Sequence, residues 1–199
     1  MAAVAAAYGN RKTRLPLARY ANRKGYRDAL NLTHGATMAG HVIGHAVQSG
    51  GIAPDEIDDV VLGCAMPRGA TGYNIARFAA HRAGLPVTTN GVTVDRQRVS
   101  SLQAIVCGAY RILNEGAKAV VAGGVESVSP VQAPGTGACS QRTIRLDQDE
   151  GVRQEVSLDR LRSLLPILES GAAVTPGNAC KLPDGASACL MIRESALLS

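Results

Sequence analysis

The stretch VTVDRQRVSSLQAI, residues 92–105, decides the fold. It begins with β-branched residues typical of a strand, passes through a tight turn, and continues into apolar residues spaced as in a helix. A strand that leads into a helix is the repeating unit of an α/β layer with parallel strands. Enzymes often carry a nucleophile at such a junction, and here the central position is Arg98.

The segments on either side of this junction continue the alternation of strands and helices. Further strands are expected at residues 60–66, 118–124 and 186–192, and further helices at residues 36–50 and 74–83. Thr33 or Asn31 is expected to cap the first of these helices, and Asn74 or Thr71 the second. The sequence therefore predicts an α/β fold with parallel strand pairings.

The helix that follows the junction is apolar on nearly every side. Its apolar residues are Leu102, Ala104, Ile105, Val106, Cys107, Ala109, Tyr110, Ile112 and Leu113. A single sheet covers only one side of a helix, so this pattern predicts a second covering layer. That layer would be more of the chain, another subunit or a missing domain.

The basic residues are concentrated at the N-terminus. The formal net charge is +5, yet residues 1–27 hold seven Lys or Arg and no acid, and the remainder sums to −2. This arm is a solvated surface segment, a patch for an anionic ligand or nucleic acid, or an organelle transit peptide. Only Tyr20 and Tyr26 are available to stack on bases, so nucleic acid is not favoured. The expected location is cytoplasmic, or mitochondrial if the arm is a transit peptide.

Composition excludes several classes of protein. An apolar content of 46% against 19% charged residues excludes wholesale disorder, and no apolar run approaches the ~18 residues of a membrane span. The five cysteines are odd in number and without C-x-x-C spacing, which favours reduced thiols and argues against a metal site. His41 and His45 lie four residues apart, without an acidic neighbour, and are interpreted as partly exposed helix histidines.

Five stretches, in one order along the chain, resemble the thiolases, enzymes that cleave or condense 3-oxoacyl-CoA. They are THGATMAGHVI, EIDDVVLGCAMPRGATGYNIARFAAHRAGLP, VTVDRQRVSSLQAI, AVVAGGVESVSP and VTPGNACKLPDGASACLMI. The resemblance runs from about residue 33 to 130 and again from about 147 to 195. Several motifs in a fixed order are far more specific than any single motif.

The resemblance implies a fold and a domain organisation. Thiolases consist of two similar β-α-β-α-β-α-β-β halves packed back to back, with a loop excursion from the first half that handles CoA. This chain resembles the N-terminal half, a mixed sheet with helices on both faces. The implied organisation is a basic arm and first strand region at 1–32, a core at 33–130, a shortened excursion at 131–172, and a return strand at 173–199. The apolar helix would lie between the two halves.

The resemblance also implies a mechanism, and the chain departs from it. Thiolases use a Cys at the strand–helix junction that becomes acylated, together with a His and a second Cys from the other half. The alignment places Arg98 at the nucleophile position, Val99 at a family Ser and Ser101 at a family Gly. A guanidinium has no nucleophilic lone pair, and a cation at a helix N-terminus is unfavourable by roughly 0.3–1 kcal/mol unless it meets solvent or an anion. Arg98 therefore marks relaxed constraint, which we favour, or a group recruited to hold a phosphate or carboxylate.

The other candidate residues are interpreted as follows. Cys180 replaces a family Ser that contacts the pantetheine arm of CoA, so Cys180 and Arg98 are the candidates for holding CoA or another anion. Cys64 and Cys107 are expected to be structural. The remaining motif residues are interpreted as scaffold: Gly123, Gly124, Glu126 and Asp184. The two glycines are expected to turn the chain at a strand end, and Asp184 is expected in the turn that enters the last strand.

Three functions are compatible with these patterns. The favoured one is a non-catalytic thiolase-like subunit or remnant with no cofactor of its own, which pairs through its sheet to form a homo-oligomer or a hetero-oligomer with a thiolase chain. The second is an acyl-CoA C-acyltransferase of fatty acid metabolism that is active only when a partner chain supplies the other half. The third is a CoA- or anion-binding module formed by Arg98 and the arm.

Overall fold

A four-stranded mixed sheet forms the centre of the computed structural model, which describes residues 30, 32–129, 155–167, 173–179 and 184–196. The strand order is β2-β1-β3-β4. The strands are β1 Asp59–Gly63, β2 Asn90–Val94, β3 Ala119–Glu126 and β4 Gly185–Ile192. β1 runs parallel to β2 and β3, whereas β4 runs antiparallel to β3. The predicted mixed α/β architecture is confirmed.

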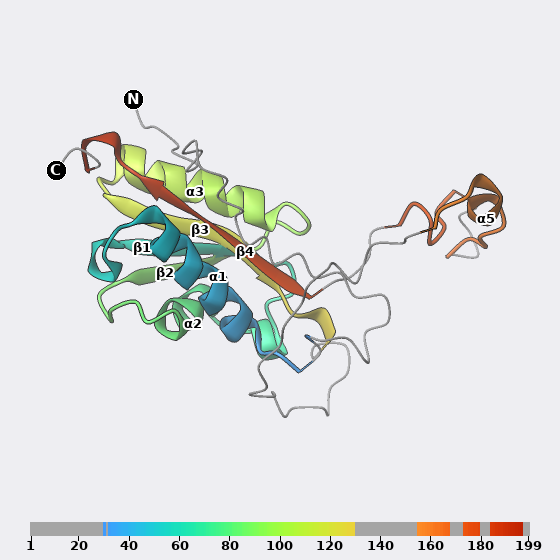
Figure 1. Cartoon of the computed structure of the whole chain (residues 1–199), viewed down its shortest axis with the longest axis horizontal. Coiled ribbons are helices and arrows are strands. Elements are labelled where there is room, and N and C mark those ends of the chain that lie inside the picture. The colour runs from blue at the N-terminus through green and yellow to red at the C-terminus, as the bar shows by residue number, and fades with distance from the viewer. Residues whose placement is uncertain (1–29, 31, 130–154, 168–172, 180–183, 197–199) are drawn as a thin grey trace.

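Helices cover both faces of the sheet (Figure 1), as predicted. α1 (Gly35–Gly50) and α2 (Ile75–Arg82) pack on one face, and α3 (Ser100–Asn114) packs on the other. A short helix, α5 (Leu158–Arg162), and three 3-10 turns complete the described elements. None of the helices in the described part of the chain is long and apolar enough to cross a membrane. The arm at 1–32 and the excursion at 131–172 lie largely outside the described residues.

The ends of α1 and α2 follow local capping chemistry, with one difference from expectation. His34 caps α1, because its Nδ1 accepts the Ala36 N–H at 3.1 Å. Thr33 does not cap this helix; its carbonyl instead accepts the Ser127 hydroxyl at 3.2 Å, and Asn31 lies outside the described residues. The cap of α2 is Asn74, as expected, whose Oδ1 accepts the Arg77 N–H at 3.3 Å.

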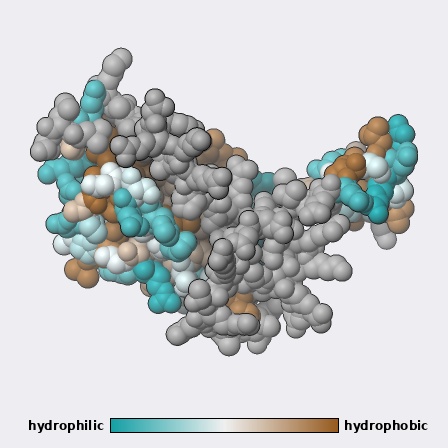
Figure 2. Space-filling view, in the orientation of Figure 1, coloured by the Kyte–Doolittle hydropathy of each residue, from teal (hydrophilic) through white to brown (hydrophobic). Residues whose placement is uncertain are grey.

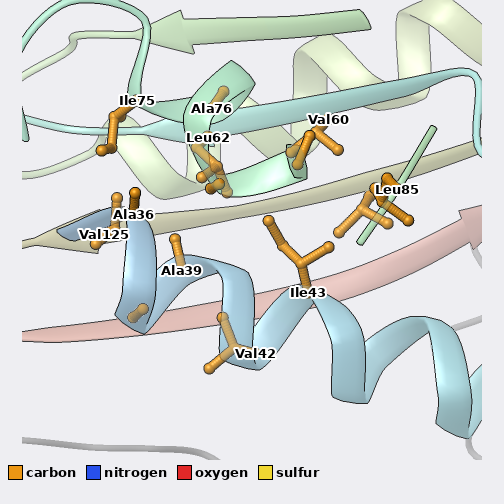
Figure 3. Packing of buried hydrophobic residues seen from close by; sticks show 14 of the residues in the cluster. Ala36, Ala39, Val42, Ile43, Val60, Leu62, Ile75, Ala76, Leu85 and Val125 are labelled. Carbon is orange, nitrogen blue, oxygen red and sulfur yellow. The ribbon is translucent and has the colours of Figure 1, made fainter. Parts of the chain in front are cut away.

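Two apolar clusters sit on opposite faces of the sheet. The larger joins α1 and α2 to the strands, and Figure 3 shows Ala39 and Ile43 of α1 pointing toward the strand residues Val60 and Leu62. The smaller lies beneath α3 and consists of Val61, Ala104, Ile112, Val120, Ala122 and Met191. Neighbouring residues of a strand point to opposite faces, so β1 contributes to both clusters and is completely buried. This explains the continuous apolar run that predicted the strand.

α3 is covered on one side only by the described residues. Its buried positions are Ser100, Ala104, Gly108 and Ile112, and a Cβ on Gly108 would overlap the methyl group of Met191. On the opposite side Leu102 is 60% exposed and Tyr110 is 57% exposed. No described residue provides the second layer that the sequence predicts for this helix.

An ion pair that the sequence analysis missed joins α3 to the sheet. Arg111 Nη2 of α3 lies 2.8 Å from Oδ2 of Asp59, whose side chain is completely buried at the start of β1. Burial raises the pKa of Asp59, and the neighbouring Arg111 opposes that rise. Arg111 also pairs with Glu115 one turn further along α3. The pair fixes the C-terminal end of the helix over the amino end of β1.

Replacement of Arg111 should destabilise the protein. Arg111→Leu leaves the Asp59 carboxylate buried without a counter-charge, so we expect the free energy of unfolding to fall by about 2–4 kcal/mol, measured by urea denaturation. The double variant Asp59→Leu, Arg111→Leu should recover most of this loss, because no buried charge then remains. The matched control is Arg160→Leu, which breaks an exposed pair with Glu155 and should cost less than about 1 kcal/mol. Equal losses in the two single variants would contradict this account.

Candidate functional site

The candidate site lies where β2 leads into α3, beside the carboxyl ends of β1 and β3. Val94, the last residue of β2, pairs with Gly63 of β1, and its carbonyl accepts the Cys64 N–H at 3.0 Å. The carboxyl ends of parallel strands meet at one edge of a sheet, which is where α/β proteins commonly place their ligands. The junction singled out from the sequence is therefore at a position suited to chemistry.

Local hydrogen bonds fix the turn between β2 and α3. Asp95 Oδ1 accepts the Gln97 N–H at 2.8 Å, and Ser100 Oγ accepts the Arg96 N–H at 2.9 Å. The Ser100 hydroxyl in turn donates to the Gln97 carbonyl at 2.5 Å. Gln97 has a φ of 52°, in the left-handed region that non-glycine residues rarely adopt. These bonds hold a strained turn that leaves Arg98 exposed at its outer side.

Two glycines allow the start of α3 to lie directly on the strands. A Cβ on Gly63 of β1 would overlap the backbone of Ser100 and Ser101, and a Cβ on Gly124 of β3 would overlap the Ser101 side chain. Gly123 lies against the backbone of β4 in the same way. The prediction that Gly123 and Gly124 turn the chain at a strand end is wrong: both lie inside β3, where the missing side chains allow close approach.

Arg98, which the resemblance to thiolases places at the nucleophile position, is exposed to solvent. It forms no ion pair with any residue that the structure describes. The neighbouring Arg96 differs, because its guanidinium donates to the Gln103 side chain. Among the described residues, no acidic side chain competes with an anion for the Arg98 guanidinium, which has no property of a nucleophile.

Cys64 is the described thiol nearest in the chain to the ends of these strands, but it is inert. Its side chain is 1% exposed, and burial together with the Glu126 carboxylate raises its pKa to about 12. At neutral pH the side chain is therefore held as the thiol, whereas the form that attacks a thioester is the thiolate. Cys64 is therefore not available as a nucleophile.

Glu126 and Asp184 have the contacts of scaffold residues. The Glu126 carboxylate, at the end of β3, accepts the backbone N–H groups of Ala65 and Met66, the latter at 3.3 Å. Asp184 is 2% exposed, and its Oδ1 accepts the Ser129 N–H at 3.0 Å. Each carboxylate fixes a loop against the sheet, in agreement with the interpretation of both residues as scaffold.

The remaining thiols and histidines within the described residues do not form a second centre. Cys107 is half-buried on α3, burial raises the pKa of Cys189 on β4, and Cys180 lies outside the described residues. The His41 and His45 rings are 4.5 Å apart, and burial and the neighbouring ring lower the pKa of His41. No group of three metal-binding side chains exists in the described ranges.

Comparisons with known proteins agree with this arrangement. The family described as "Thiolase, N-terminal domain" matches residues 18–143 and 130–195. The steroid 3-ketoacyl-CoA thiolase FadA6 of Mycobacterium tuberculosis is 46% identical over 80 residues, which cover 40% of this chain and 20% of that protein. The 3-ketoacyl-CoA thiolase of Vibrio vulnificus is 26% identical over 233 residues, covering 83% of this chain and 60% of that protein.

A third relative extends the same pattern. The acetyl-CoA acetyltransferase of Rhizobium meliloti is 25% identical over 248 residues, covering 84% of this chain and 63% of that protein. The chain thus spans less than two thirds of the length of these relatives. The alignments with the Vibrio vulnificus and Rhizobium meliloti proteins are longer than the 199 residues of this chain, so these two relatives carry internal residues that have no counterpart in it.

Alkylation should separate the buried thiol from the half-buried one. In the folded protein at pH 8, iodoacetamide should modify Cys107 at least about 100-fold faster than Cys64, because Cys64 is both inaccessible and protonated. Peptide mass spectrometry over time measures both rates, and in urea the two should become similar. Rapid native modification of Cys64 would contradict the inert role assigned to it.

Proposed function

Because the chain belongs to the thiolase family and has the fold of a thiolase N-terminal domain, we propose that it is a non-catalytic member that acts as an oligomerising subunit. The observation that carries this proposal is Arg98, which stands where the family's nucleophilic Cys would stand. At a helix N-terminus a thiol loses its proton readily, because the helix dipole and the free N–H groups stabilise the thiolate. A guanidinium at the same place cannot accept an acyl group.

No other side chain at the junction supports acyl transfer. Ser100 is 4% exposed and its hydroxyl is held by the turn, so it is closed to a substrate. Serine also needs a general base, and all four histidines of the chain lie elsewhere. They occupy α1, its N-cap and α2, on the face of the sheet opposite α3: His34, His41, His45 and His81. The junction thus lacks a nucleophile and a base among the described residues.

Anion binding is the second candidate function. It is favoured because Arg98 is exposed and forms no ion pair with the described residues. A phosphate or carboxylate of a CoA derivative would meet a cation that no acidic side chain of the described part neutralises. Calorimetric titration with CoA tests this candidate, and loss of the heat signal in Arg98→Ala would support it.

The three described cysteines are free thiols, in keeping with the reducing, cytoplasmic-type compartment that we propose.

The proposed function predicts that the protein does not become acylated. After incubation with acetyl-CoA, intact mass spectrometry should detect no acetyl adduct, and this should not change when a catalytically active thiolase chain is added. An active thiolase treated alone is the positive control, because its nucleophilic Cys retains the acetyl group. An adduct that maps to any residue of this chain would refute the non-catalytic assignment.

Restoring a thiol at the junction should restore thiol activation but not acyl transfer. In Arg98→Cys the new thiol lies at the positive end of α3, whereas in the control Asn114→Cys it lies at the negative end of the same helix. We expect the first pKa to be lower by about half a unit to one and a half units. The pH dependence of the alkylation rate measures both pKa values. Equal values would mean that the junction does not favour a thiolate.

A further inference from the structure

A groove of about 350 Å³ lies between α1 and α2, on the face of the sheet opposite α3. Its polar lining consists of Thr37, His41, His45 and Gln48 of α1 and Arg82 of α2. Steps of three and four residues return to the same side of a helix, so the four residues of α1 form one row. From Thr37 to His45 this row extends about 12 Å. The surface over α1 and α2 is mostly polar, with apolar atoms only scattered on it (Figure 2).

Two glycines of α1 shape the groove. A Cβ on Gly40 would lie 2.8 Å from the Cβ of Arg82, so the missing side chain lets the end of α2 come close to α1. A Cβ on Gly44 would meet only the carbonyl oxygen of Ala83, at 4.0 Å. Gly40 therefore brings Arg82 against α1, and Gly44 leaves the space beside it open.

Arg82 lies at the end of the groove nearest to the start of α1. Its Nε donates to the Thr37 hydroxyl at 3.4 Å. Burial, together with the charge of Arg82, lowers the pKa of His34, the residue that caps α1. Arg82 is exposed and forms no ion pair with the residues that the structure describes. A guanidinium carries five N–H donors, so this one can still bind an oxyanion.

The two imidazoles lie further along the row. The ring centroids of His41 and His45 are 4.5 Å apart, and their planes are inclined at 70°. Burial and the neighbouring His45 lower the pKa of His41. A neutral imidazole can donate one N–H to an oxyanion, and a protonated one can donate two. The pair can therefore contact an anion in either protonation state.

The sequence around the groove contains cations and no acids. Residues 29–54 and 60–94, which include both helices, hold three Arg and four His but no Asp or Glu. Acidic side chains would compete with an anionic ligand for the guanidinium and the imidazoles. A surface layer that carries charge of one sign also attracts ligands of the opposite sign.

We propose that the groove between α1 and α2 binds a small phosphorylated compound that carries two anionic groups. One group contacts Arg82 and Thr37, and the second contacts His41 and His45. Two groups are needed because the two ends of the row are too far apart for a single phosphate. The site is independent of Arg98 and of the proposed function, because α3 lies on the other face of the sheet.

A transition metal ion is the alternative ligand for two histidines one helical turn apart. The described part of the chain provides no third His, Cys, Asp or Glu to complete such a site. The guanidinium of Arg82 in the same groove repels a metal ion and attracts an anion. The charges therefore favour the phosphorylated compound.

Nuclear magnetic resonance of the full-length protein, labelled at histidine, tests the site. The chain has only four histidines, and single His→Gln variants assign their signals. Titration with tripolyphosphate at constant ionic strength should shift the signals of His41 and His45 and leave that of His81, which does not line the groove. Tripolyphosphate should bind at least about 10-fold more tightly than inorganic phosphate, because it presents anionic groups to both ends.

Variants of the groove test the assignment of its residues. Arg82→Gln should weaken tripolyphosphate binding at least about 10-fold and remove its advantage over inorganic phosphate. The matched control Arg68→Gln removes an exposed Arg outside the groove and should leave the His41 and His45 shifts unchanged. Gly44→Leu should fill the groove and abolish binding, whereas Gly44→Ala should retain it. Circular dichroism establishes that each variant is folded.

Three results would overturn the inference. They are unchanged His41 and His45 signals at millimolar tripolyphosphate, equal weakening in Arg82→Gln and Arg68→Gln, and a response of the two signals to zinc ions but not to tripolyphosphate. The last result would make the groove a cation site. None of these results bears on acyl transfer, so the non-catalytic assignment stands or falls by the acetyl-CoA experiment alone.

Discussion

The close approach of α3 to the carboxyl ends of β1 and β3 is the constraint on which the rest of the structure depends. It requires the absence of side chains at Gly63 and Gly124, because a Cβ at either position would overlap Ser100 or Ser101. With its first turn fixed there and its last turn held by the ion pair between Arg111 and Asp59, the helix has no freedom to roll. The face that carries Leu102 and Tyr110 is therefore directed away from the sheet.

The same constraint explains why the fold accommodates an arginine at the turn before α3. The turn is closed by Asp95 and Ser100, and Arg98, which lies between them, contributes none of these bonds. Arg98 is exposed, so its long side chain displaces nothing in the core. The packing of this junction therefore does not depend on the side chain at position 98. This is the physical basis for a thiolase family fold with a cation at this turn.

The sequence predicted the elements well, because each depends on local pattern. The apolar run of β1 follows from the burial of that strand, and the cap of α2 follows from the need of Arg77 for an acceptor for its backbone N–H, which Asn74 supplies nearby in the sequence. The sequence did not predict contacts between residues that lie far apart along the chain. The pairs Asp59–Arg111 and Cys64–Glu126 join residues more than fifty positions apart, and the cap of α1 at His34 competed with more typical capping residues beside it. At the site, the strand–helix pattern placed Arg98 at the junction and the resemblance to thiolases gave its position a role, whereas the burial of Cys64 beside Glu126 became evident only from the fold.

The cation at the start of α3 has a physical cost. The positive end of a helix stabilises a thiolate and disfavours a guanidinium, so Arg98 at this turn has an unfavourable charge interaction of roughly 0.3–1 kcal/mol. Solvent reduces that cost, and an anion removes it. Arg98 is exposed and forms no ion pair with the described residues, so solvent is what reduces the cost within the part of the chain that the structure describes.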